Sequence, residues 1–183
     1  MIFLVAVLVG VLAGLLLGGR LSNLPSLKLK WLWLVLGGLV LQVLIFPLFS
    51  ERPLLPYATV PLHYLSYGMV FLFLFLNLRV RPLLALGAGA LLNLLPIAAN
   101  GGRMPASATA LARAGYVEVA ERLASGSTHG NVLLMSEGTR LNILGDWLYL
   151  PSWVPFATAF SIGDLLIMIG VAWLIVRGMR KHA

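Results

Sequence analysis

Asp164 is the residue with the clearest potential for chemistry, because it is the only charged side chain between residues 157 and 176. About seven residues into a membrane helix, it would lie ~10 Å below the outer end, since each residue adds ~1.5 Å. A carboxylate there costs at least ~2.5 kcal/mol unless it is paired or hydrated. In the run Ser-Ile-Gly-Asp, Ser161 can bond to nearby backbone and Gly163 permits close helix approach. We therefore expect Asp164 to face the protein interior with a partner.

Arg103 is the predicted partner, and it lies in the run Asn-Gly-Gly-Arg-Met-Pro that begins at Asn100. Asparagine and glycine accept the left-handed dihedral angles that end a helix, and proline prevents its continuation. We expect Gly101 or Gly102 to have a positive φ, and Arg103 to turn back and contact Asp164 directly or through one water or ligand. The pair would be a structural ion pair between two helices, or the guanidinium would bind a phosphate or carboxylate in bidentate fashion.

Asp146, Asp164 and His129 are the candidates for acid–base catalysis. Asp146 follows Leu-Gly and Asp164 follows Ile-Gly, 18 residues later, and two carboxylates can act as acid and base if they converge. The spacing of His63 and His129 is not that of metal ligands, so we predict no metal site. We interpret His63 as a hydrogen-bonded core residue.

Common catalytic signatures are absent from the sequence. It has no cysteine and no Ser-x-x-Lys, Gly-x-Ser-x-Gly or His-Glu-x-x-His motif. The usual signatures of nucleophilic and zinc hydrolases are therefore missing, and no cofactor is expected.

The composition indicates a membrane protein. Of the 183 residues, 60% are hydrophobic and only 10% are charged, against roughly 25% charged residues in soluble domains. This excludes a soluble globular domain, a disordered chain and a coiled coil. The net charge of +7 does not predict nucleic-acid binding, because its distribution follows the predicted membrane topology.

Five apolar segments are predicted to cross the membrane as helices. A helix needs about 20 residues to span the ~30 Å hydrocarbon core, and backbone in lipid must satisfy its own hydrogen bonds. The sequence therefore predicts a single all-α membrane domain over residues 1–183. The short link at residues 79–82 makes the third and fourth spans antiparallel neighbours. The spans are residues 2–19, 31–49, 54–78, 83–99 and 157–176.

The charges between the spans predict the orientation. Segments 20–30, 79–82 and 177–183 contain only basic charged residues, whereas the other connecting segments carry both signs. Basic residues favour the cytoplasmic side. We therefore expect a multi-pass protein of the bacterial cytoplasmic membrane, with the N-terminus outside and the C-terminus inside. The basic residues of the three segments are Arg20, Lys28, Lys30, Arg79, Arg81, Arg177, Arg180 and Lys181.

The extracytoplasmic segment, residues 100–156, is predicted to be helical. Start and stop signals favour a helix over 105–126 and a second short helix over 131–144. The aromatic residues at 147–156 are typical of the level of the lipid head groups.

Strongly polar residues in the spans fall in their outer halves. Gln42, His63, Asn93 and Asp164 would together form a pocket that opens to the outside, unless each only joins two helices. The ligand-binding candidates are Arg103, Asp164, His63, Asn93, Asn100 and Ser161.

The motifs also carry a family resemblance. The run Asn-Gly-Gly-Arg-Met-Pro at 100–105, Leu-Gly-Asp at 144–146 and Phe-Ser-Ile-Gly-Asp at 160–164 resemble a family of small bacterial membrane proteins known only as a domain of unknown function. The resemblance covers essentially the whole chain. It implies a bacterial integral membrane protein and no particular activity, substrate or cofactor.

The leading functional hypothesis is a binding or accessory protein of the membrane. Its pocket would hold an anionic lipid head group, a small polar ligand or a partner subunit. The alternatives are an intramembrane enzyme acting on a lipid-linked substrate and a proton-coupled transporter formed by an oligomer. The inner halves of the spans are almost without polar residues, which disfavours the transporter.

Overall fold

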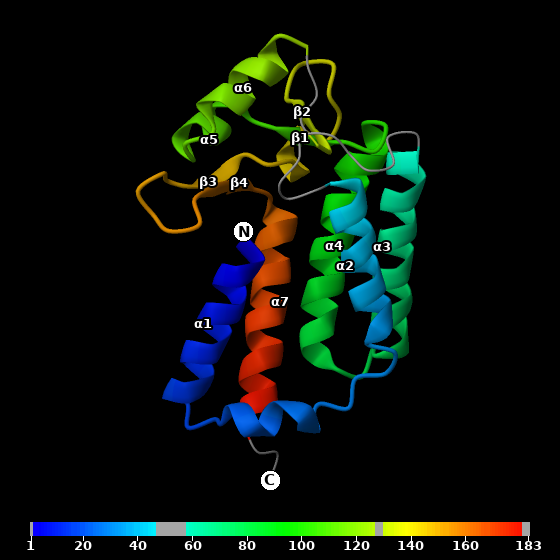
Figure 1. Cartoon of the computed structure of the whole chain (residues 1–183), viewed down its shortest axis with the longest axis vertical. Helices are drawn as coiled ribbons and strands as arrows, with labels where there is room; N and C mark the ends of the chain where they lie inside the picture. The colour runs from blue at the N-terminus through cyan, green and yellow to red at the C-terminus, as the bar shows by residue number, and fades with distance from the viewer. Residues whose placement is uncertain (1, 47–57, 127–129, 181–183) are drawn as a thin grey trace.

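The computed structural model describes residues 2–46, 58–126 and 130–180. Apolar helices run side by side and carry a smaller cap at one end, built from the chain between the fourth and fifth of them (Figure 1). Successive bundle helices alternate in direction. The start of the first helix lies beneath the cap, and the end of the last helix lies at the opposite end. The bundle helices are α1 (Ile2–Leu16), α2 (Trp33–Ile45), α3 (Thr59–Leu76), α4 (Arg81–Ala99) and α7 (Ile162–Met179).

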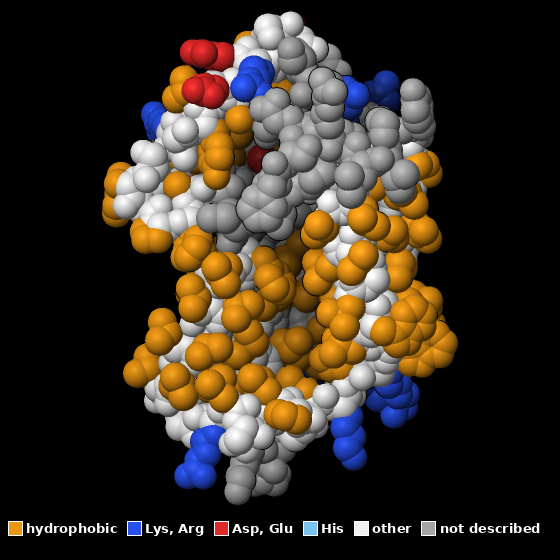
Figure 2. All heavy atoms as spheres, in the orientation of Figure 1, with side chains coloured by type: hydrophobic (Ala, Val, Ile, Leu, Met, Phe, Trp, Pro, Cys, Tyr) orange, Lys and Arg blue, Asp and Glu red, His pale blue; other side chains and the backbone are white. Residues whose placement is uncertain are grey.

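Three of the described helices, α3, α4 and α7, are long and apolar enough to cross a membrane. Helix α1 has 15 residues and α2 has 13, so each rises only ~20 Å. The ends of the predicted spans 31–49 and 54–78 at residues 47–57 lie outside the described residues. Hydrophobic side chains form a band over the bundle, with Lys and Arg at the end opposite the cap and both charge signs at the cap (Figure 2). Large apolar side chains exposed in this way are typical of contact with lipid.

Helix α7 lies between α1 and α4 (Figure 1). Its contact with α4 is close, and glycine at position 163 permits it. A Cβ at Gly163 would overlap the side chain of Asn93 and lie 2.7 Å from the carbonyl oxygen of Gly89. Small residues at such positions let membrane helices approach closely. Helices α2 and α3 pack together, and their shared core includes Leu34 and Phe73, which are 4% and 3% exposed.

A short 3-10 helix, η1 (Leu21–Ser26), crosses the bundle at the end opposite the cap (Figure 1). Hydrogen bonds join it to the end of α7: the Arg20 amide and the Asn23 side chain both donate to the carbonyl oxygen of Met179 at 2.8 Å. At the same end, Asn77 accepts from the Lys30 amide and donates to the Lys30 carbonyl oxygen. Side-chain amides therefore satisfy backbone groups where the helices end.

The cap contains short strands as well as helices. Strand β1 (Met104–Ala106) pairs in parallel with β2 (Val132–Leu134), and β3 (Leu148–Leu150) pairs antiparallel with β4 (Thr158–Phe160). Helices α5 (Ala108–Arg113) and α6 (Val117–Ala124) and the 3-10 helix η3 (Asn142–Leu144) complete it. A small core of its own holds it together, made of Ala106, Leu111, Ala120 and Leu123.

The cap corrects three predictions. The helix predicted over 105–126 is two helices, because Gly115 has φ +90°. The helix predicted over 131–144 is wrong. Residues 132–134 at its start form strand β2, because their backbone groups hydrogen-bond to strand β1 and not to a following helical turn. The last span begins at Ile162 rather than at 157, because residues 158–160 pair with β3. The described part of the chain is therefore mostly helical, with two small sheets.

The predicted turn after α4 is confirmed. Gly101 and Gly102 have φ values of +67° and +90°, which residues with a side chain rarely adopt. The Gly102 amide donates to the carbonyl oxygen of Ile97 at 2.8 Å. A Cβ at Gly102 would also lie 2.9 Å from Val60 of α3, so this position requires glycine for two reasons.

Candidate functional site

A polar cluster joins α4 to the start of α7. The Asn93 side-chain amide donates to Asp164 Oδ1 at 2.7 Å, and the Ser161 hydroxyl donates to Asn93 Oδ1 at 2.6 Å. Ser161 and Asp164 also form a capping box, in which the Ser161 amide donates to Asp164 Oδ2 at 3.0 Å. Asn93 and Ser161 are buried, at 6% and 0% exposure. The structure thus brings together three of the predicted site residues.

Arg103 does not complete this cluster. No ion pair between Arg103 and Asp164 forms in the described part of the chain, and the Arg103 side chain is exposed. The predicted direct contact is therefore wrong. The reason is that Asp164 lies in the first turn of α7 and not at mid-span. There the Ser161 amide and the Asn93 side chain donate to its carboxylate.

Asn100 is a structural residue at the end of α4. Its side-chain nitrogen donates to the carbonyl oxygens of Pro96 and Arg140, both at 2.8 Å, and its oxygen accepts from the Arg140 amide at 2.9 Å. These bonds use both ends of the amide to attach the cap to the helix. The ligand-binding role expected of Asn100 gains no support from this geometry.

His63 belongs to a second polar group, between α2 and α3. It is 3% exposed, and its Nδ1 lies at hydrogen-bond distance, 3.0 Å, from the Gln42 side-chain nitrogen. The same Gln42 nitrogen donates to the Ser66 hydroxyl, and that hydroxyl donates to the His63 carbonyl oxygen. Nε2 of His63 is buried without a hydrogen-bond partner among the described residues. The core interpretation of His63 fits these contacts.

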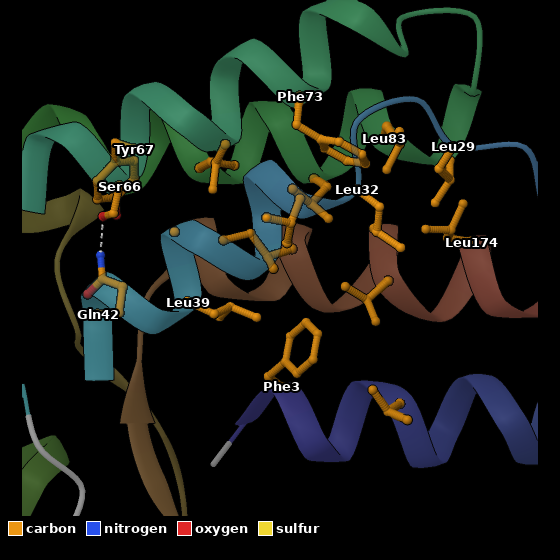
Figure 3. A pocket seen from close by; sticks show the side chains of 18 of the residues that line it. Phe3, Leu29, Leu32, Leu39, Gln42, Ser66, Tyr67, Phe73, Leu83 and Leu174 are labelled. Atoms are coloured by element: carbon orange, nitrogen blue, oxygen red, sulfur yellow. Dashed lines mark hydrogen bonds between the residues drawn. The ribbon is translucent and has the colours of Figure 1, made fainter. Parts of the chain in front are cut away.

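An apolar cavity of about 440 Å³ lies between the bundle helices. Gln42, Ser66 and Tyr67 line it at one end, and the side chains labelled along the rest of it are hydrophobic (Figure 3). Phe3 points into it from α1 (Figure 3). We call this space the membrane cavity. Its lining residues are Phe3, Val7, Leu29, Leu32, Val35, Gly38, Leu39, Gln42, Ser66, Tyr67, Val70, Phe73, Leu83, Leu86, Ala90, Ile167, Val171, Leu174 and Ile175.

The polar cluster lies one helical turn beyond the polar end of the membrane cavity. Ala90 of α4 and Ile167 of α7 line the cavity. Asn93 lies three residues after Ala90, and Asp164 lies three residues before Ile167, so each shares a helix face with a lining residue. Tyr67 lines the cavity too, and the charges of Asp164 and Asp146 both act on its phenol. A carboxylate pair therefore lies near the polar end.

Asp146 is the more unusual of the two carboxylates. It follows η3 in the cap, and its amide donates to the Pro105 carbonyl oxygen at 2.8 Å. Its Oδ1 is buried with no hydrogen-bond partner among the described residues. Burial raises the pKa of the Asp146 carboxyl well above its ordinary 3.8, and the charge of Asp164 raises it further. The charge of Asp164 therefore acts on Asp146, so the two aspartates lie within electrostatic range of each other. The third acid–base candidate, His129, lies outside the described residues.

Comparison with known proteins identifies the family. The model of DUF5317, a family of unknown function, matches residues 26–176. The chain belongs to this family. It is also similar to an uncharacterized protein of Thermotoga maritima, with 28% identity over 172 residues that cover 93% of this chain and 85% of that protein. No solved structure matches it. The resemblance to a family of unknown function is therefore confirmed.

Two residues that line the membrane cavity of this DUF5317 protein, Ser66 and Tyr67, were not among the site residues predicted from the sequence. Ser66 and Tyr67 lie three and four residues after His63, so they share its helix face. That spacing, combined with the polar types, was the available signal. Their contact with the membrane cavity depends on how α3 packs against α2.

Proposed function

We propose that this DUF5317 protein crosses the bacterial cytoplasmic membrane five times, with its N-terminus and cap outside. The alternating directions of α1, α2, α3, α4 and α7 support this topology (Figure 1). So does the basic end of the hydrophobic band (Figure 2). The short helices α1 and α2 would be accommodated by local thinning of the bilayer or by their flanking residues.

Labelling of single cysteines tests this topology. The exposed positions Ser22 and Arg180, changed to Ser22→Cys and Arg180→Cys, should resist a membrane-impermeant thiol reagent in intact cells, whereas Ser152→Cys in the cap should react. All three should react after the cells are opened, which controls for burial. Reaction of Ser22→Cys in intact cells would contradict the model.

We infer that the protein binds an amphiphilic lipid, with its chain in the membrane cavity. The observation that carries this proposal is the 440 Å³ apolar space with polar groups at one end only. Sites for small molecules have ~300–1,000 Å³. A helix of a partner subunit, ~10 Å across, would fit for only about one turn, whereas a flexible hydrocarbon chain fits an irregular space.

The polar end favours a head group that donates hydrogen bonds. Gln42, Ser66 and Tyr67 line that end, and the carboxylates of Asp146 and Asp164 lie near it. Arg103, the cation expected to attract an anionic head group, is exposed. The described inner lining is apolar, so this cavity offers no polar path for a proton-coupled transporter.

A second candidate function is an intramembrane enzyme that acts on a lipid-linked substrate. The observation that favours it is the buried Oδ1 of Asp146, which has no hydrogen-bond partner among the described residues, together with the charge of Asp164, which acts on the same carboxyl. Two carboxyl groups in different environments can serve as acid and base. In this case Asp146 would be the acid and the lipid site would hold the substrate.

Filling the membrane cavity tests the lipid proposal. Leu39→Trp places an indole in the cavity, whereas Leu36→Trp makes the same change on the same helix outside its lining; Leu39 and Leu36 are 52% and 57% exposed. Each protein is purified in a mild detergent and its retained lipids are measured by mass spectrometry. A lipid species should copurify with the parent and Leu36→Trp and fall about tenfold in Leu39→Trp, since each CH₂ excluded from the cavity costs ~0.8 kcal/mol. Equal lipid retention by both variants would refute the site.

A further inference from the structure

We propose that the cap holds a second ligand site, for a small organic ammonium ion with an apolar body. The site is a separate cavity of about 200 Å³, here called the cap cavity. It shares no lining residue with the membrane cavity, so the proposal does not rest on lipid binding. Its lining residues are Ala106, Leu111, Tyr116, Val119, Val132, Asp146, Thr158 and Ala159.

Asp146 is the feature that points to a ligand. It lines the cap cavity, and its Oδ1 is buried without a hydrogen-bond partner in the described ranges. The other polar groups of the lining are occupied: the Tyr116 hydroxyl donates to the Ala157 carbonyl oxygen and the Thr158 hydroxyl to that of Ala159, both at 3.1 Å. A buried carboxylate oxygen left unpaired is costly, and a donor in the cavity would remove that cost.

The charges near the cavity favour a cation as that donor. Asp164 acts on Asp146 as a second negative charge. No described Lys or Arg forms an ion pair with either carboxylate, and Arg113 of the cap donates to the Tyr149 hydroxyl at 2.8 Å. An ammonium group offers three donors and a full positive charge. It would therefore satisfy Oδ1 and offset the repulsion between the two aspartates.

The rest of the cavity limits the size and polarity of the ligand. Apart from Asp146, Tyr116 and Thr158, the lining consists of Ala, Val and Leu side chains. A volume of 200 Å³ holds on the order of six water-sized groups at ~30 Å³ each. A short alkylammonium such as n-butylammonium matches both the volume and the apolar lining.

Binding of n-butylammonium to the full chain tests the proposal. The protein is placed in nanodiscs of zwitterionic lipid, and binding is measured by saturation-transfer NMR. 1-Butanol, of similar size and uncharged, is the matched ligand control. We expect the parent to bind n-butylammonium at least about tenfold more tightly than 1-butanol, because a charged hydrogen bond contributes ~1.5–3 kcal/mol.

Two variants and one control variant locate the site. Asp146→Asn should weaken n-butylammonium binding about tenfold or more, and Ala159→Ile should weaken it by filling the cavity without changing charge. Glu137→Gln, which removes an exposed cap carboxylate, should bind as the parent does. If Asp146→Asn does not fold, Ala159→Ile and the comparison of the two ligands decide the question.

The pH dependence of binding distinguishes a cationic ligand, which needs the ionised Asp146 carboxylate, from a ligand that binds the protonated carboxyl. Ammonium binding needs the ionised carboxylate, so affinity should rise from pH 5 to pH 8. Among the described residues, Asp164 of α7 and Tyr67 of α3 interact electrostatically with Asp146, and Tyr116 before α6 lines the cap cavity with it. The pH profile of Asp146→Asn shows the contribution of these three titratable groups. The proposal is overturned by no binding to the parent, by equal binding of 1-butanol, by undiminished binding to both variants, or by affinity that falls as pH rises.

Discussion

Gly163→Val should prevent α4 and α7 from packing and should sharply reduce the amount of folded protein. A Cβ at this position would overlap the side chain of Asn93 and lie 2.7 Å from the Gly89 carbonyl oxygen. Two helix backbones would have to separate, which costs ~1–3 kcal/mol for overpacking alone. Displacing Asn93 would also break its bonds to Ser161 and Asp164, at ~1–3 kcal/mol for each buried group left unpaired.

The matched control for this variant is Gly68→Val. Gly68 lies in α3, and a Cβ there would meet no atom within 4 Å. Both variants make the same change in a bundle helix, so the difference between them isolates the α4–α7 contact. Fluorescence-detected size exclusion and thermal unfolding in detergent should show a folded Gly68→Val protein and an aggregated or strongly destabilised Gly163→Val protein. Equal thermal stability of the two would show that α4 and α7 do not pack as described.

Asp146→Asn should stabilise the protein at alkaline pH and have much less effect at acid pH. Burial, followed by the charge of Asp164, raises the pKa of Asp146 in the native state above its ordinary 3.8. Between the unfolded and native pKa values, the native state binds more protons than the unfolded state, so stability falls as pH rises through this window. Asparagine keeps the shape of the neutral carboxyl and removes the titration.

Thermal unfolding of the parent and of Asp146→Asn at pH 5 and pH 8 measures this effect. The unfolding temperature of the variant should exceed that of the parent at pH 8, by ~2–4 °C for each kcal/mol in a chain of this size. The excess should be smaller at pH 5. Glu137→Gln, which removes an exposed carboxylate, should show no such dependence. If the difference in unfolding temperature between Asp146→Asn and the parent is the same at pH 8 and at pH 5, Asp146 is not buried in the folded protein.

Much of the candidate site could be predicted from the sequence, but its pairing could not. The cost of a carboxylate in an apolar segment marked Asp164 as needing a partner, and Ser161 and Asn93 were both among the candidates. The direct contact expected between Arg103 and Asp164 does not form, because an apolar segment does not reveal where its helix starts. The pairing of β4 with β3 moves that start to Ile162, and Asp164 then caps its own helix.

The sequence by itself determined the apolar helices, three of which are long enough to cross a membrane, and the turn after α4. Hydropathy is a local property of each segment, and the left-handed turn depends on two adjacent glycines, so neither needed knowledge of distant contacts. Tertiary structure alone decided the strands of the cap, the two cavities and the unpaired oxygen of Asp146. Each of these depends on groups far apart in the chain, such as β1 with β2 or Phe3 with Leu39 across the membrane cavity. Pairing and packing between distant segments leave no periodic signal in the sequence, because short strands and cavity walls use the same apolar residues as the rest of the bundle.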